Sequence, residues 1–240
     1  MPLQAVESSR LYRQIAEQLR GLIAGGEFAP GARLPAERDL ARQLGVSRPS
    51  VREALIALEV EGWVEVRSGS GIYVQPQPQR NGAARAPAND GTAEWGPLEV
   101  MRARELVEGE VAALAARRAK KPQLAAMASA LAQMRDEAEA GVGPQSGDEA
   151  FHHAIAQACG NEVLSDTVRS YWHARQGPLF SRLGDHFENP ASWQAALAEH
   201  AAVLAAIRAR DPEAARAAMQ QHLKKATGRY SASWKRANKP

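Results

Sequence analysis

"ARLPAERDLARQLGVSRPSVREALIALEVEGWVEVRSGSGIYV", residues 32–74, combines two helical patterns with a change to a strand pattern. Residues 35–45 and 46–62 each repeat apolar side chains at the three- and four-residue spacing of an amphipathic helix. Residues 63–74 instead place short β-prone runs on both sides of a Gly/Ser turn, which predicts a β-hairpin. The stretch therefore predicts two consecutive helices followed by a two-stranded hairpin.

The ends of these helices carry residues that are typical of helix caps. Pro35 lies near the first position of the first helix, and Gly45 closes it. Ser47 is the expected N-cap of the second helix, because a serine oxygen accepts backbone N–H groups there. One more helix is predicted upstream, ending at Gly25 and Gly26, with a buried stripe of Leu11, Ile15, Leu19, Leu22 and Ile23.

Helix, helix-turn-helix and hairpin in this order predict a winged helix-turn-helix, whose second paired helix lies in the DNA major groove. Arginine suits such a surface, because its planar guanidinium binds a phosphate or a guanine edge through two hydrogen bonds. Serines at the start of the second helix could add phosphate contacts. The predicted contacts are Arg38, Ser47, Arg48, Ser50, Arg52 and Arg67. The alternative is a solvated charged face on a domain that binds other proteins.

A Pro-, Gly- and Gln-rich stretch divides the chain into two parts. We predict a winged helix-turn-helix domain over residues 1–74, a linker over 75–94, an all-helical domain over 95–230 and a basic tail over 231–240. Alanine is abundant after residue 97, and alanine-rich sequence favours helices. The expected fold class is therefore mainly α, with a small β-hairpin wing on the first domain.

Composition limits the classes of protein that remain. The formal net charge is +3 and the isoelectric point is about 9.2, which is compatible with a polyanionic partner. The single cysteine, Cys159, excludes an internal disulfide and favours a reducing compartment. We see no signal peptide and no run near the ~20 apolar residues of a membrane span. A cytoplasmic protein without a membrane partner is expected.

Several histidines in the second half lie on predicted helices. Asp148 and His152 are four residues apart and share a helix face, whereas His153 lies about 100° further round the axis. His200 and His222 lie on two later apolar helices. Three imidazoles and one carboxylate could bind one divalent transition metal. The alternative reading of each histidine is a hydrogen-bonded residue of the core.

The quoted stretch resembles the DNA-binding domain of the GntR family of bacterial transcription regulators. The shared features include Leu34 and Pro35, the Gly-Val-Ser-Arg run at 45–48, the Val-Arg-Glu-Ala-Leu run at 51–55 and the Gly-Ser-Gly wing at 69–71. The resemblance implies that a homodimer binds a double-stranded DNA operator with an inverted repeat. It also implies that Arg38, Arg48 and Arg52 contact bases or phosphates, and that Gly69 enters the minor groove.

The second half resembles the FCD-type effector domain of the FadR-like branch of that family. The similarity lies in PLEVMRARELVEGEVAALAARRA (97–119), DEAFHHAIAQACGN (148–161) and EHAAVLAAIRARDPEAARAAMQQHL (199–223). It implies a metal bound by Asp148, His152, His200 and His222. One transition metal per chain is expected, zinc first, with nickel or manganese as alternatives, because nitrogen ligands suit calcium and magnesium poorly.

The resemblance further implies that a small carboxylate effector binds beside the metal, with Arg104 pairing with its carboxylate. Asn161 is a candidate effector contact and fits equally well as a helix cap. The predicted function is a DNA-binding transcriptional regulator, a repressor released by a small organic acid, rather than an enzyme. Two alternatives stay open: a regulator with a structural metal or none and a non-acid effector, and a metalloenzyme fused to a DNA-binding domain.

Overall fold

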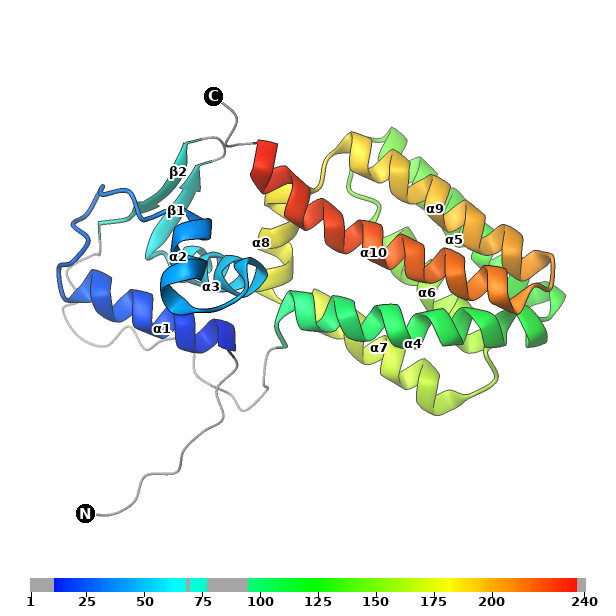
Figure 1. Ribbon diagram of the computed structural model, residues 1–240. Coiled ribbons are helices and arrows are strands. Elements are labelled where there is room, and N and C mark those ends of the chain that lie inside the picture. The colour runs from blue at the N-terminus through cyan, green and yellow to red at the C-terminus, as the bar shows by residue number, and fades with distance from the viewer. Residues whose placement is uncertain (1–10, 68–69, 77–94, 237–240) are drawn as a thin grey trace, which may run out of the picture. The chain divides into compact units, whose positions relative to one another are not determined.

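The computed structural model describes residues 11–67, 70–76 and 95–236, and Figure 1 shows their helices and strands. The chain divides into two compact units, residues 1–96 with 234–240 and residues 97–233. Among the described residues, the first contains three helices and a hairpin, and the second contains helices joined by short loops. The predicted mainly α fold class with a small wing is confirmed.

The first helix, α1 (Leu11–Ala24), packs against α3 through one apolar face. Its buried residues are Tyr12, Ile15, Ala16, Leu19 and Ile23. Leu11 and Leu22 are exposed, so the predicted stripe was wrong at these two positions. The buried stripe is centred on Ile15 and Leu19. Tyr12 and Ala16 lie on the same helix face and are buried there instead of the two exposed leucines.

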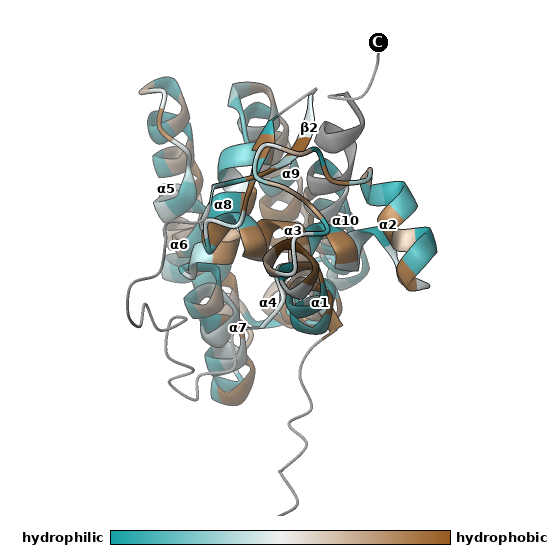
Figure 2. Ribbon diagram, turned by 90° about the vertical axis from the view of Figure 1, so that its left-hand side faces the viewer, coloured by the Kyte–Doolittle hydropathy of each residue, from teal (hydrophilic) through white to brown (hydrophobic). Residues whose placement is uncertain are grey.

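Helices α2 (Glu37–Leu44) and α3 (Arg48–Val60) form the helix-turn-helix. Gly45 ends α2 in the left-handed conformation with φ 66°, and Ser47 caps α3 by accepting the Ser50 N–H, as predicted. Pro35 lies two residues before α2 rather than within it, because Ala36 is the N-cap. Most of α3 is apolar, as its brown colour in Figure 2 shows, and its residues 51–59 are buried.

The wing is an antiparallel pair of β1 (Val64–Arg67) and β2 (Gly71–Val74). The register places Val64 opposite Val74 and Arg67 opposite Gly71. Val64, Ile72 and Val74 are buried, so one face of the hairpin completes the small core beside α3. Both strands lie within the predicted hairpin of residues 63–74, and the turn between them lies at the predicted Gly/Ser stretch.

One buried carboxylate joins α2 to α3. Glu37 Oε2 accepts hydrogen bonds from Arg52 Nε at 3.0 Å and Nη2 at 2.7 Å, and both side chains are buried. Glu37 Oε1 accepts a third bond from Arg48 Nε at 2.8 Å. Because a buried charge needs a partner of opposite sign, Glu37 fixes the relative position of the two helices and the direction of Arg48.

The second unit contains α4 (Pro97–Arg118), α5 (Lys121–Glu139), α6 (Gln145–Ala158), α7 (Glu162–Arg175), α8 (Pro178–Phe187), α9 (Pro190–Arg208) and α10 (Pro212–Arg236). Helix α6 packs against α4, α5 and α7. A Cβ on Gly147 would lie 2.6 Å from the Met134 backbone nitrogen, so only glycine lets α6 approach α5 this closely. The Gly147 N–H donates a hydrogen bond to Glu137 of α5, and this bond fixes the start of α6.

Helix α10 lies beside α4 and α9 (Figure 1) and is joined to both by ion pairs. Arg216 donates to both carboxylate oxygens of Glu110 on α4, at 2.6 and 2.9 Å. Arg229 pairs in the same two-bond manner with Glu199 on α9. These contacts join α10 to α4 and α9, and α4 packs in turn against α6 and α9.

Glu37→Gln is expected to destabilise the first unit by about 3 kcal/mol, because it removes the charge that pairs with buried Arg52. Asp39→Asn is the matched control, since its partner Arg42 is largely exposed and such pairs contribute only about 0–1 kcal/mol. Hydrogen exchange of the α3 backbone amides measures both changes. Equal protection in the two variants would contradict this role of Glu37.

Candidate functional site

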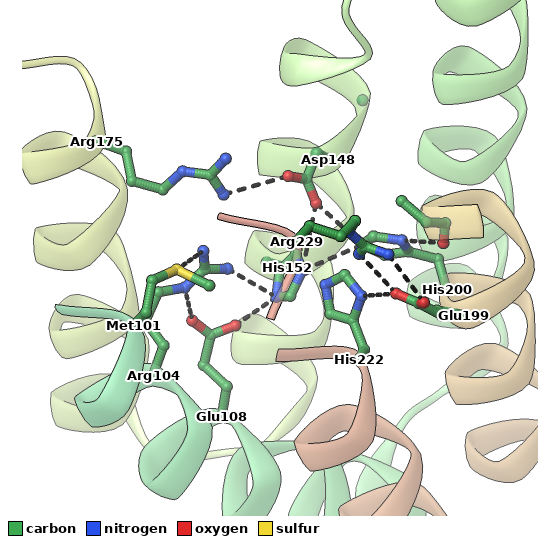
Figure 3. Close-up of polar contacts among 12 residues, drawn as sticks. Met101, Arg104, Glu108, Asp148, His152, Arg175, Glu199, His200, His222 and Arg229 are labelled. Atoms are coloured by element: carbon green, nitrogen blue, oxygen red, sulfur yellow. Dashed lines mark hydrogen bonds and ion pairs between the residues drawn. The ribbon is translucent and has the colours of Figure 1, made fainter. Parts of the chain in front are cut away.

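Figure 3 shows the four predicted metal ligands meeting inside the helical unit. Asp148 and His152 project from α6, His200 from α9 and His222 from α10. One ligand atom from each lies within 4.8 Å of the other three, and all three histidines are buried. His200 Nε2 is 2.9 Å from Asp148 Oδ1 and 3.2 Å from His152 Nε2. The fold therefore brings together residues that are up to 74 positions apart, from 148 to 222.

Hydrogen bonds at the opposite ring nitrogens orient the three imidazoles. His152 Nδ1 donates to Glu108, His222 Nδ1 donates to Glu199 at 2.9 Å, and His200 Nδ1 donates to the Ala196 carbonyl at 2.7 Å. Because carboxylate and carbonyl oxygens only accept, each Nδ1 carries the proton. The Nε2 atom of each ring then faces the centre of the cluster, and once it has given up its proton it can offer a lone pair to a metal ion there.

The charges of these groups suit a bound cation. Burial would raise the pKa of Asp148, but hydrogen bonds from His152 and His200 and the charge of Arg175 hold it well below its usual value. Burial, with His200 and His152 beside it, lowers the pKa of His222 well below its usual value. Burial would also lower the pKa of His152, but Glu108 and Asp148 together raise it. The centre thus holds an ionised carboxylate and attracts positive charge.

The donor set fits a transition-metal ion. Ligand atoms about 2.1 Å from a tetrahedral centre lie roughly 3.4 Å apart, which is close to the separations between His152, His200 and Asp148. His152 Nε2 and His200 Nε2 lie 3.2 Å apart, and once unprotonated both could coordinate a cation placed between them. The residues present could therefore hold a metal ion without a change of fold.

Further charged side chains surround the cluster, and of these the sequence singled out only Arg104. Glu108 accepts from Arg104 Nε at 2.5 Å as well as from His152, and these charges lower its pKa to about 2 despite its burial. Asp148 Oδ2 accepts from Arg175 Nη1 at 3.2 Å. The four-residue spacing of Arg104 and Glu108 was a usable signal, but nothing in the sequence linked Arg175 to Asp148.

The two candidate effector residues have different surroundings. Arg104 lies beside the cluster, but its side chain is buried, pairs with Glu108 and covers the ring of Trp172 with 4.6 Å from Cζ to the centroid. Asn161 is the N-cap of α7 and accepts the Leu164 N–H at 3.2 Å. Asn161 is not brought to the cluster, so the structure gives it the cap geometry that the sequence also allowed.

A cavity of about 60 Å³ opens beside the cluster. One water needs roughly 10–15 Å³ on this measure, so the cavity has room for several waters or a small ligand. His200, His222 and Asp148 line it together with Arg104, Arg175 and Arg229. Trp193 also lines it, and its Nε1–H is buried without a hydrogen-bond acceptor within the described part of the chain. Polar and cationic groups thus surround a small space at the candidate metal ligands.

The predicted DNA contacts divide into exposed and buried residues. The side chains of Arg38 and Arg48 are 79% and 42% exposed, on α2 and at the start of α3. Ser47 and Ser50 share a hydrogen bond at the same end of α3, and Arg67 is half-exposed on the wing. Arg52 is only 4% exposed and pairs with Glu37 behind this surface. Gly69 lies outside the described residues.

Comparison with known proteins assigns both units. The sequence matches the bacterial regulatory proteins of the gntR family over residues 11–74 and the FCD domain over residues 99–225. The chain belongs to the GntR family. Its FCD domain places it in the FadR-like branch, whose members are DNA-binding transcriptional regulators rather than enzymes. The metalloenzyme alternative is thereby set aside.

Individual relatives agree over nearly the whole chain. The Uxu operon transcriptional regulator of Escherichia coli K12 is 37% identical, over 91% of this chain and 86% of its own length. The HTH-type transcriptional repressor NanR of Klebsiella aerogenes is 32% identical, over 96% of this chain and 87% of its own. Among solved structures, E. coli McbR/YncC matches 93% of this chain and 98% of its own with 25% identity and a TM-score of 0.51.

Among the helices described for this chain, none is long and apolar enough to cross a membrane.

Glu108→Gln is expected to weaken divalent-metal binding about 10–100-fold, because it removes the carboxylate that orients His152. Glu110→Gln on the same helix is the control, since Glu110 is exposed and pairs with Arg216. Competition between the protein and a chromophoric zinc chelator measures both affinities. A Glu108→Gln affinity equal to that of Glu110→Gln would contradict the orienting role.

Proposed function

We propose that this chain is a homodimeric repressor whose DNA binding is controlled by a small organic acid bound beside a metal. The observation that carries this proposal is the meeting of four metal-binding side chains with a cavity that arginines also line. Membership of the GntR family supports the part of the proposal that makes this chain a DNA-binding regulator. The metal, the acid, the dimer and the sign of regulation are the parts that we add.

The exposed residues of the first unit support contacts in the major groove. Arg48 stands at the N-terminal end of α3, with its Nε held by Glu37 and its side chain partly exposed. Ser47 and Ser50 lie beside it, where the first N–H groups of the helix favour a phosphate. Arg38 on α2 and Arg67 on the wing would flank these contacts. Arg52 would act through Glu37, as part of the support behind Arg48.

Three imidazoles and one carboxylate favour a borderline transition metal. Zinc fits this set best, and nickel or manganese would also accept it, whereas calcium and magnesium prefer oxygen ligands throughout. Asp148, His152, His200 and His222 would hold the ion. When bound, it would supply one or more open coordination positions for an anionic ligand.

The cavity supports a short acid as that ligand. Arg175 and Arg229 are both partly exposed and line the cavity, so either guanidinium could pair with a carboxylate. The Trp193 N–H could donate to a hydroxyl or carboxylate oxygen. A space of about 60 Å³ favours short hydroxy-, keto- or dicarboxylic acids over long acyl chains.

The regulatory cycle follows from linkage between the two binding events. A dimer would place one α3 in each of two major grooves, about one helical turn apart on an inverted repeat. An acid that binds one arrangement of the dimer more tightly shifts the population toward it. The relative that is named a transcriptional repressor supports repression, rather than activation, as the effect of DNA binding. Binding to a bacterial chromosome would place this activity in the cytoplasm.

One observation favours a second candidate, in which the metal is structural and the effector is not an acid. Arg104 is paired with Glu108, Arg175 with Asp148 and Arg229 with Glu199. Each guanidinium near the cavity therefore already has a carboxylate partner, and an incoming acid would have to compete with it. Measurement of acid binding decides between the two candidates.

Arg48→Ala is expected to lower affinity for the operator by about 1–3 kcal/mol, the range for loss of a two-bond base contact. Arg42→Ala, a largely exposed arginine on α2, is the comparison variant. The duplex can be enriched from a random pool by the unmodified protein, and fluorescence anisotropy then gives the affinities. Unchanged binding by Arg48→Ala would remove it from the contact set.

His200→Ala is expected to lose most of the bound metal, whereas His153→Ala should keep about one ion per chain. The reason is that His200 Nε2 faces the cluster and His153 is absent from it. Elemental analysis of protein purified without a metal-affinity step measures the content. Equal metal in the two variants would show that the ligand set is wrong.

The same proteins test the acid. A thermal-shift screen of short acids should raise the melting temperature of the unmodified protein and leave His200→Ala unchanged. Arg175→Gln should retain the metal and lose the response to acid, because Arg175 lines the cavity without being a ligand. Metal binding without any response to acids would favour the structural-metal candidate.

A further inference from the structure

Residues 31–34 run along the free edge of the wing and fix Arg33 there. The Gly31 N–H donates to the Val74 carbonyl at 2.8 Å, and the Leu34 N–H donates to the Ile72 carbonyl at 2.8 Å. The Val74 N–H donates back to the Ala32 carbonyl at 2.9 Å. These bonds make Arg33 the antiparallel partner of Tyr73. Hydrogen bonds on both sides of Arg33 therefore hold its backbone against β2.

The strand register places Arg33 on the outer face of the wing. Ile72 and Val74 are buried on the inner face, so Gly71 and Tyr73 point outward. Arg33 stands opposite Tyr73 and shares its face, and it is exposed. Arg67 stands opposite Gly71 on the same face, and its Cζ lies 4.7 Å from the centroid of the Tyr73 ring.

The guanidinium of Arg33 lies over Gly71, directly beside the turn of the wing. A Cβ built on Gly71 would be 2.5 Å from Arg33 Nε and 3.1 Å from Cζ and Nη2. Any other residue at position 71 would displace this side chain. Gly71 also has φ 128°, which disfavours a side chain for a second reason. The glycine thus leaves room for a cation at the base of the turn.

The positive charge at this point is only partly balanced. Arg67 donates to Glu65 Oε2 at 2.9 Å, and Gln75 donates to the same oxygen at 2.8 Å. Over the ranges that the structure describes, no carboxylate pairs with Arg33. Two guanidiniums and one carboxylate therefore share the outer face of the wing, which leaves a net positive charge that attracts anions.

We propose that Arg33 is a DNA phosphate contact, acting with Arg67 on the flank of the wing. The two guanidiniums lie beside the turn rather than at its tip, and a wing that enters a groove brings its flanks next to the sugar-phosphate strands. The anion that matches two adjacent guanidiniums is a phosphate. This inference rests on the DNA binding of the family and is independent of the metal and the acid.

The test is binding of the full chain to fluorescein-labelled duplex DNA, measured by anisotropy over a series of KCl concentrations. One duplex is enriched from a random pool by the unmodified protein, and the other has an unrelated sequence. Arg33→Gln should reduce the slope of log affinity against log salt by about 0.9, the value for one phosphate contact. At ~0.1 M salt this slope corresponds to a loss of roughly eight-fold, equal for both duplexes.

Arg20→Gln is the charge-matched control, because Arg20 lies on α1 and pairs with Glu61 at 2.8 Å. It should leave the salt slope unchanged. The proposal is overturned if Arg33→Gln leaves the slope equal to that of Arg20→Gln. A loss confined to the enriched duplex would also overturn it, because that result would mean that Arg33 contacts a base.

Gly71→Ala provides an independent test, since its Cβ would move the Arg33 guanidinium away from the turn. As a single substitution, Gly71→Ala should reduce the slope of log affinity against log salt. Added to Arg33→Gln, it should cause no further reduction. An equal reduction in both backgrounds would show that the position of the guanidinium over Gly71 is irrelevant. Circular dichroism of each variant verifies that the wing unit stays folded.

Discussion

The Glu108 carboxylate, buried between Arg104 and His152, is the interaction on which the interior of the helical unit depends. Without it, Arg104 would be a buried cation with no anionic partner, and His152 would lose the acceptor that fixes its Nδ1 proton. With it, His152 Nε2 faces His200 and Asp148. A single side chain on α4 therefore sets both the charge balance of the core and the direction of a candidate metal ligand on α6.

The first unit uses the same physical arrangement for a different purpose. Glu37 is buried beside Arg52 and holds Arg48, as Glu108 is buried beside Arg104 and holds His152. In each unit one carboxylate pairs with a buried arginine and orients a second side chain. That second side chain is Arg48 at the surface of the first unit and His152 beside the cavity of the second. Burial of the pair makes the orientation rigid, because neither partner can leave without exposing an uncompensated charge.

The sequence predicted the features that depend on local pattern. The order of helices and wing, the Ser47 cap and the αL ending at Gly45 follow from periodicity and capping chemistry, and the structure confirms them. Asp148 and His152 could be placed on one face because they are four residues apart. Glu199 and Arg175 could not be linked to the cluster, since their contacts cross between helices and no periodic signal records which faces meet. Arg52 was misleading for a related reason: its spacing from Arg48 shows a shared face, but not that Glu37 lies beneath it.

Asp148 joins the two binding events of the proposed function. One of its oxygens faces His200 and the other accepts from Arg175, so the same carboxylate serves the metal cluster and an arginine of the cavity. An acid that pairs with Arg175 competes with Asp148 for it and leaves more of the Asp148 charge to the cluster. Acid and metal should therefore strengthen each other's binding, and by linkage the effect must be equal in both directions.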